Sequence, residues 1–567
     1  MATCLLLFSI TLFTNYALAN SVDIWFLGID SRDPTIGIAM RAHIEMRNSS
    51  SYSVSIRGVN FDKSVLYSFL LSGYAIKYVC GIDVDRIAVN VHIDGSTQIK
   101  GASASLAYVM GILKALNRID IPYTRWGATG VVSIDGFVDA IGGLSTKIRA
   151  AKESGLESVY IPMINGMGKS EDSIVNSVKV IEIASLADLC RGLTLDNSSI
   201  EPSLKVLRTI NEFFIREAER FLQMAKSIVD NAPGDKKEAL SLLYEESSKN
   251  VGRALGKGHG YTAASYAFLG YMQILYRYLM LNNTRSGYLI EESEEIVKNA
   301  LNEFTKFKYI HSSTIPVVVV ILDRVTEAQY YIDLYRNATR SSTSLESLQT
   351  TLEFVAKAYA RSLTVDTWLH LLKLVNSSAN GGSYEGGQLI PFNKTYATIL
   401  NVLRAVSLTI DWGQELAPLS LSAIASTRSS LAKKLDSNLQ LRVIDSIKRL
   451  YRIHSSYLDT GARAIPYIYY IYFEDLVLEG GDESISVLSM STLIASITNI
   501  VNDAMSRGGM EMALDYRDVL IPYDVRIVVL LLNITLLLLL TASLLYIIAV
   551  SYKFKITFKE LLKLWII

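Results

Sequence analysis

The sequence carries no net charge and has little histidine and cysteine. Its 55 Lys and Arg residues balance 55 Asp and Glu residues, so the formal net charge is +0 at pH 7. A chain without a basic surplus has no general attraction for nucleic acid, and we expect no nucleic-acid partner. The six histidines show no His-x-x-x-His spacing, and the cysteines show no Cys-x-x-Cys spacing. We therefore expect no metal and no cofactor.

Cysteine is rare, which limits the covalent links that the chain can form. Of Cys4, Cys80 and Cys190, the first lies in an apolar segment at the N-terminus. In an oxidising compartment Cys80 and Cys190 could form a disulfide, and two buried thiols are the alternative. Sequence alone gives no Cα separation for this pair, so both possibilities stay open.

A phosphate-binding loop is also missing. Residues 252–258 read Gly-Arg-Ala-Leu-Gly-Lys-Gly. This segment is one spacer too short for such a loop and lacks the Ser or Thr that follows the loop's lysine. No ATPase module precedes the first predicted domain, so we expect an activity that does not depend on ATP.

Two apolar segments lie at the ends of the chain. Residues 1–19 finish in Ala-Leu-Ala, which predicts a signal peptide cleaved before Asn20, with a short uncleaved anchor as the alternative. A bilayer core needs about 20 apolar residues, and residues 526–550 contain such a run, which predicts a transmembrane helix. Lysines follow this run, so the positive-inside rule places residues 551–567 in the cytoplasm as a tail.

This topology predicts a single-pass protein of the cell membrane with a large N-terminal ectodomain outside the cell. Six Asn-x-Ser/Thr glycosylation acceptors lie in that ectodomain, which supports the same orientation. They are Asn48, Asn197, Asn282, Asn337, Asn376 and Asn393.

Between the two ends the sequence predicts two regions. Residues 20–195 mix strand and helix patterns, which is typical of an α+β domain. Its expected elements include strands over 24–27, 36–40, 42–46 and 87–93 and a helix over 63–79. After a polar linker, residues 203–525 are helical almost throughout, with breaks rich in Gly and Asn. We expect a mostly α-helical region of stacked helix pairs, similar to a solenoid but without a fixed period.

The first candidate for a reactive group is Ser103, in the segment Gly101-Ala102-Ser103-Ala104-Ser105. The strand over 87–93 precedes it, and a helical pattern that begins near Leu106 follows it. Ser103 is therefore expected at a helix N-terminus. Backbone N–H groups and the positive end of the helix dipole gather there, and both suit an oxyanion.

A second cluster supplies a candidate base. Residues 129–138 predict a β-hairpin with a tight Asp-Gly turn. Ile-Gly-Gly-Leu-Ser-Thr-Lys follows at 141–147. Lys147 is thus expected at the start of a helix that ends near Gly155, before another strand over 158–162.

The order of these motifs resembles the proteolytic domain of the Lon family, whose members are peptidases with a Ser-Lys dyad. The resemblance covers roughly residues 24–190, about a third of the chain. It implies that Ser103 is the nucleophile, that Lys147 is the general base, and that Thr129 helps to orient the lysine. The family usually has Asp-Gly-Pro-Ser-Ala-Gly at the serine, whereas this chain has Lys-Gly-Ala-Ser-Ala-Ser. Family members commonly assemble into rings, so the resemblance also implies a possible homo-oligomer.

The chemistry of such a dyad follows from its two side chains. A serine hydroxyl is a weak nucleophile and needs a base. A lysine is a base only when neutral, and burial among apolar residues such as Leu144 and Ile148 can lower its usual pKa of about 10.4 by several units. Together these features predict an ATP-independent, membrane-anchored, extracellular serine endopeptidase that acts on peptides or unfolded proteins.

Other interpretations use the same residues. Taken alone, Ser103 would be an ordinary N-cap serine and Lys147 an ordinary surface lysine. The altered serine loop, with Lys100 where the family has an acid, supports a second hypothesis, in which an inactive Lon fold serves as a cell-surface receptor or scaffold. A Ser-His-Asp triad with His92 is conceivable, although His92 is better explained as a strand residue.

Overall fold

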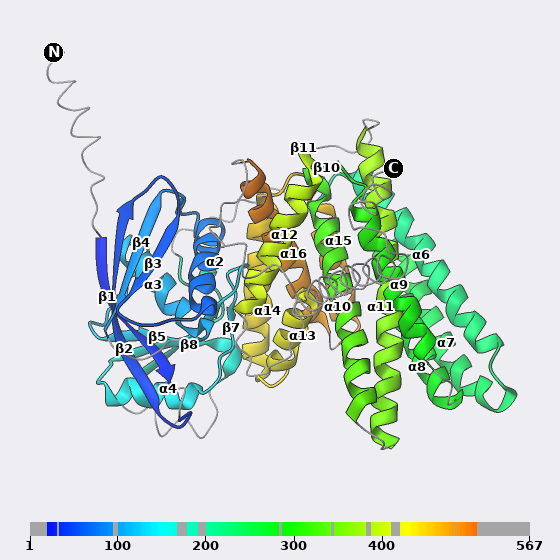
Figure 1. The fold of residues 1–567 in the computed structure, drawn as a ribbon, viewed down its shortest axis with the longest axis horizontal. Coiled ribbons are helices and arrows are strands. Elements are labelled where there is room, and N and C mark those ends of the chain that lie inside the picture. The colour runs from blue at the N-terminus through cyan, green and yellow to red at the C-terminus, as the bar shows by residue number, and fades with distance from the viewer. Residues whose placement is uncertain are drawn as a thin grey trace, which may run out of the picture. The chain divides into compact units, whose positions relative to one another are not determined.

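The computed structural model of the chain describes ten stretches. They are residues 20–30, 33–94, 100–166, 178–190, 200–282, 286–341, 345–380, 387–409, 420–481 and 483–506. The predicted signal peptide (1–19), transmembrane helix (526–550) and tail (551–567) lie outside the described residues. An N-terminal mixed α/β sheet domain is followed by a largely helical region (Figure 1).

A seven-stranded sheet forms the N-terminal domain, in the order β3-β4-β2-β1-β5-β8-β9. The strands are β1 (Asn20–Ile29), β2 (Gly37–Asn48), β3 (Ser53–Arg57), β4 (Ile87–Ile93), β5 (Trp126–Ala128), β8 (Ser158–Pro162) and β9 (Lys179–Ile183). The sheet is mixed, because β1 pairs antiparallel with β2 and parallel with β5. β2 joins the two strands predicted over 36–40 and 42–46. The exposed Arg41 between them pairs with Trp25 of β1, so this charged residue does not interrupt the strand.

Three helices cover the two faces of the sheet. They are α2 (Lys63–Cys80), α3 (Ser105–Ala115) and α4 (Leu144–Glu153). Along β1, Ile24 and Phe26 belong to the core that includes α2 and α3, whereas Leu27 belongs to the core that includes α4. This alternation follows from the period of two in a strand. The α2 helix, predicted over 63–79, begins at the capping residue Asp62 and ends before the left-handed Gly81.

A short hairpin and a disulfide complete this domain. The hairpin predicted over 129–138 consists of β6 (Val131–Val132) and β7 (Val138–Asp139), with Gly136 in the left-handed region at its turn. The structure joins Cys80, at the end of α2, to Cys190, with 5.5 Å between their Cα atoms. The disulfide therefore holds α2 against the turn η3 (Leu186–Asp188), which lies just before Cys190.

The helical region has eleven described α-helices. They are α6 (Leu204–Asp230), α7 (Gly234–Gly256), α8 (Gly260–Asn282), α9 (Gly287–Phe304), α10 (Ile315–Ser341), α11 (Leu345–Asn380), α12 (Phe392–Leu408), α13 (Leu421–Ala432), α14 (Ser437–Ser456), α15 (Ala464–Leu478) and α16 (Ser484–Ser506), together with the short strand pair β10 (Tyr309–His311) and β11 (Leu389–Pro391). The expected stacked array is wrong. α16 contacts α10, α12, α13, α14 and α15, whereas each unit of an array contacts only its neighbours.

Among the described residues, α16 is the one helix that is long and apolar enough to cross a membrane. However, 83% of its apolar window is buried inside the fold. A core helix needs the same length and composition, so α16 is weak evidence for a membrane span.

The two regions share one hydrophobic core. Buried residues of the sheet domain, such as Phe69 of α2, belong to the same apolar cluster as Ile447 and Leu450 of α14 and Leu488 of α16. Burial of apolar side chains is the main favourable contribution to folding, so each region contributes to the stability of the other.

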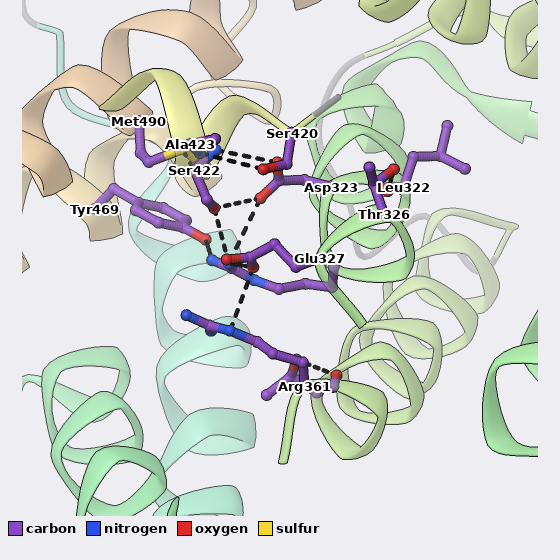
Figure 2. Close-up of polar contacts among 12 residues, drawn as sticks. Leu322, Asp323, Thr326, Glu327, Arg361, Ser420, Ser422, Ala423, Tyr469 and Met490 are labelled. Atoms are coloured by element: carbon purple, nitrogen blue, oxygen red, sulfur yellow. Dashed lines mark hydrogen bonds and ion pairs between the residues drawn. The ribbon is translucent and has the colours of Figure 1, made fainter. Parts of the chain in front are cut away.

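A buried ionic cluster ties four helices of the helical region together (Figure 2). We call it the α10 cluster; its members are Asp323, Arg324 and Glu327 of α10, Arg361 of α11, Ser422 of α13 and Tyr469 of α15. Arg324 pairs with Glu327 on its own helix and donates to the Tyr469 hydroxyl at 3.1 Å. Ser422 donates to Asp323 at 2.6 Å. Buried charges are tolerated where each finds such partners.

Candidate active site

Ser103 lies in the 3-10 turn η1 (Ala102–Ala104), which leads directly into α3. The turn begins at Gly101, whose φ of 83° is a backbone conformation that L-residues with side chains rarely adopt. The Gly101 N–H donates to Ser64 Oγ at 3.0 Å, which holds the entry of the turn against the start of α2. The Ser103 residue is 8% exposed and therefore nearly buried.

The base of the β6–β7 hairpin is hydrogen-bonded to this serine turn. The Gly130 N–H donates to the Ser103 carbonyl at 2.8 Å, and the Leu106 N–H donates to the Gly130 carbonyl at 3.1 Å. Ser105 Oγ links the same two segments, because it donates to the Gly130 carbonyl and accepts from the Val132 N–H at 2.8 Å. The position of Ser103 therefore depends on the position of the hairpin.

Thr129 precedes this hairpin and is fully buried. Its N–H donates to the Tyr160 carbonyl of β8 at 3.0 Å. Its hydroxyl donates to the Ser103 carbonyl, with 3.4 Å between the two oxygens. The structure thus brings Thr129 into contact with the serine turn.

Lys147 comes from the first turn of α4 and is 4% exposed. Its N–H donates to the Gly143 carbonyl at 3.1 Å, which anchors it to the start of the helix. Leu144 and Ile148, the apolar neighbours expected around it, are both buried. Lys147 Nζ donates to Ser103 Oγ at 3.1 Å. The structure therefore places the two side chains in direct contact.

This arrangement places a hydroxyl next to an amino group inside the fold. A nucleophile and a base within about 2.6–3.2 Å can exchange a proton, and the amino group reaches the hydroxyl at that distance. The N–H groups of Ser105 and Leu106 already donate to the carbonyls of Ala102 and Gly130. Donors for an oxyanion would therefore come from residues before Ser105 in the same turn.

Residues 75–193 match the family model described as the Lon protease (S16) C-terminal proteolytic domain. This finding confirms the resemblance for that part of the chain, which we now call the Lon-like domain. The matched residues include Ser103, Thr129 and Lys147.

Several proteins named as Lon proteases are similar to part of this chain. Lon protease 2 of Bacillus subtilis is 31% identical over 142 residues, which cover 25% of this chain and 24% of that protein. The Archaeal Lon protease of Thermoplasma acidophilum is 27% identical over 148 residues, or 25% of this chain and 22% of that protein. The Lon protease of Xanthomonas oryzae is 40% identical over 86 residues, or 14% and 10%. The chain thus spans a quarter or less of the length of these relatives.

The two other candidates from the sequence, His92 and the glycine-rich segment 252–258, lie in other elements of the fold. His92 lies on β4 with its side chain 60% exposed, and its Nε2 lies 3.7 Å from the Asp94 carboxylate. Residues 252–258 form the end of α7 and the turn into α8, whereas a phosphate-binding loop joins a strand to a helix. Within the described stretches, no group of three or more His, Cys, Asp or Glu side chains could hold a metal ion.

Sequence reasoning missed a buried ion cluster next to the Lon-like site. Arg428 of α13 bridges Asp135 and Asp139 of the hairpin, and Asp135 was considered only as a turn residue. A usable signal was present in the sequence. Asp135 and Asp139 lie on either side of the apolar residues Phe137 and Val138, and carboxylates that become buried with such residues need a cation as partner.

Proposed function

We propose that the chain is a serine endopeptidase that works without ATP, anchored in the cell membrane with its active site outside the cell. Its nucleophile is Ser103 and its general base is Lys147. The observation that carries the proposal is the 3.1 Å contact between Lys147 Nζ and Ser103 Oγ, made by two nearly buried side chains. The match of residues 75–193 to a proteolytic domain supports the same chemistry.

The mechanism follows from these groups. Ser103 Oγ attacks the carbonyl carbon of the peptide bond while neutral Lys147 takes the hydroxyl proton. N–H groups of the serine turn, at the positive end of α3, stabilise the oxyanion. The Lys147 ammonium then protonates the leaving amine, and the substrate's acyl group remains bonded to Ser103 Oγ. A water molecule then gives a proton to Lys147 and attacks this ester. As the acid leaves, Lys147 returns that proton to Ser103 Oγ, which restores the hydroxyl and the neutral amine.

Thr129 has a positioning role in this proposal. Its hydroxyl contacts the Ser103 carbonyl and its backbone is hydrogen-bonded to β8, so it links the serine turn to the sheet. A fixed turn reduces the entropy that must be lost when the hydroxyl and the base are brought together.

The cellular location rests on three features. A disulfide between Cys80 and Cys190 persists in oxidising compartments, which favours the outside of the cell. The apolar residues 1–19 and 526–550 supply the predicted signal peptide and membrane anchor. Peptides and unfolded proteins are the substrates that we expect for this activity.

The experiment uses the full-length chain, purified in detergent micelles, and fluorescently labelled casein without ATP. We expect cleavage that increases from pH 6 to pH 10 and that disappears in Ser103→Ala and Lys147→Ala. Lys152→Ala is the matched control, because Lys152 lies on the same helix but is exposed. Cleavage that survives both substitutions would refute the dyad. A wild-type chain that cleaves nothing would favour the inactive receptor or scaffold.

A further inference from the structure

Arg428 is a fully buried arginine that connects the helical region to the Lon-like domain. Its guanidinium makes four hydrogen bonds, at 2.7 and 3.1 Å to the Asp135 carboxylate and at 2.7 and 2.9 Å to the Asp139 carboxylate. It also lies over the Phe137 ring, with 4.5 Å between the guanidinium carbon and the ring centroid. Only the planar fork of arginine can serve both carboxylates at once.

The electrostatics of this group make the contact costly to break. Burial would raise the pKa of Asp135, but the Arg428 charge and its hydrogen bonds outweigh burial and lower that pKa. Burial raises the pKa of Asp139 in spite of the same cation. Removing one partner of a buried ion pair leaves a charge without compensation.

Two further helices hold the same turn of the hairpin. His454 of α14 contacts the Asp135 carbonyl through Nε2 at 3.0 Å. Ser496 of α16 donates to the Ile134 carbonyl at 2.8 Å. The tip of the hairpin is therefore attached to α13, α14 and α16.

The base of the hairpin is attached to the serine turn through Gly130, Ser105 and Val132, as described above. Each strand between tip and base, β6 and β7, is only two residues long. Such a short hairpin cannot bend much between its two attachments, so a shift at the tip also shifts the base.

We infer that Arg428 is a positioning residue for the peptidase site: by fixing the tip of the hairpin, it holds the hairpin's base and with it the Ser103 hydroxyl in line with Lys147. The helical region is then part of the catalytic unit. This inference rests on the proposed function.

The test compares Arg428→Lys with the wild-type full-length chain, with kcat and KM measured on labelled casein. Lysine keeps the charge but cannot bridge two carboxylates. We expect kcat to fall at least tenfold while KM changes less than twofold. Asp139→Asn is a second variant. It leaves the ion pair between Arg428 and Asp135, whose charges cancel, and we expect its kcat to fall several-fold.

The matched control is Arg324→Lys in the α10 cluster. Arg324 is also a buried arginine, and the carboxylates that pair with it, Asp323 and Glu327, lie on its own helix. We expect this variant to lose thermal stability but to keep kcat within twofold of the wild type.

The outcomes are distinguishable. Wild-type cleavage that depends on Lys147 establishes the proposed function, whatever Arg428 does. Given that cleavage, a normal kcat in both Arg428→Lys and Asp139→Asn would overturn the positioning role. An equal loss of kcat in Arg324→Lys would overturn it too, because the effect would then be general destabilisation. A wild-type chain without cleavage would overturn both proposals.

Discussion

Lys147 Nζ lies 3.1 Å from Ser103 Oγ, although the two residues are 44 positions apart. Each side chain comes from the N-terminal end of a helix, Ser103 just before α3 and Lys147 in the first turn of α4. Two helix N-termini place positive partial charge around the pair. That field favours a negative charge that develops at this site.

The substitution Lys147→Arg tests whether Lys147 acts as a base or only supplies a positive charge. Arginine keeps a positive charge but stays protonated at all accessible pH values, so it cannot accept the Ser103 proton. Because general bases typically contribute 10²–10⁴-fold, we expect kcat on casein to fall by about that factor across pH 6 to 10. Circular dichroism serves as the control for folding. A folded variant with residual activity that still increases with pH would contradict the role of Lys147.

Gly143→Ala tests whether the start of α4 positions the lysine. Gly143 has a φ of 62°, and a Cβ added there would lie 2.1 Å from Ile29 Cδ1. A left-handed non-glycine residue costs about 1–2 kcal/mol, so we expect the free energy of unfolding to fall by about that amount. We also expect kcat to fall, because Lys147 is hydrogen-bonded to this residue.

The neighbouring Gly142→Ala is the control for that substitution. A Cβ at Gly142 meets no atom within 4 Å. We expect its stability to stay within about 0.5 kcal/mol of the wild type, with unchanged cleavage. Urea unfolding and casein cleavage measure both variants. Equal stability and equal kcat in the two would show that Gly143 does not position Lys147.

The disulfide predicts a redox effect on stability. Cys80 and Cys190 are 110 residues apart, and a link that closes a loop of this size typically stabilises a fold by about 2–5 kcal/mol. We expect the double variant Cys80→Ser/Cys190→Ser to melt at a lower temperature, whereas Cys4→Ser should not. Denatured protein should titrate two fewer thiols before reduction than after it. Equal thiol counts would show that the bond is absent.

His454 predicts a pH dependence of stability. Burial lowers the pKa of this histidine from its usual 6.5. The folded state therefore favours neutral imidazole, so the contribution to stability is complete above pH 6.5. As the pH falls below that value, the unfolded chain binds a proton that the folded chain does not, and stability decreases by up to about 1.4 kcal/mol per pH unit.

Urea unfolding at pH 7.5 and 5.5 measures this effect on the full-length chain. We expect His454→Gln to reduce the difference between the two pH values. His43→Gln is the control, because His43 is an exposed histidine of β2, and it should keep the difference. A slope that His454→Gln leaves unchanged would assign the pH dependence to other groups.

Local patterns explain which parts of the fold the sequence predicted well. The strand over 87–93 matches β4 because alternate apolar residues are a local signal. The helix over 63–79 matches α2 within one residue because Asp62 and Gly81 mark its ends. The contact between Ser103 and Lys147 was expected through motif order, since no local pattern brings residues so far apart together.

Tertiary contacts explain what sequence reasoning missed. Arg428 lies in a helix where an isolated arginine is typical of an exposed face, and only the Asp135 and Asp139 side chains make its burial favourable. The central position of α16 likewise depends on five helices that pack around it. Neither the ion cluster of Arg428 nor the packing around α16 produces a periodic pattern in the sequence segments involved.

Asp135 and Arg428 are far apart along the chain, so they are synthesised at different times. These two residues are 293 positions apart, so at about 5–20 residues per second the arginine is added roughly 15–60 s after the aspartate. Until then Asp135 and Asp139 lack the Arg428 guanidinium, and burying two carboxylates without it is too costly. The ion cluster of Arg428, Asp135 and Asp139 is therefore completed only after α13 has been made. A nascent chain therefore carries Ser103 and Lys147 for this time without the Arg428 contact that we infer aligns them.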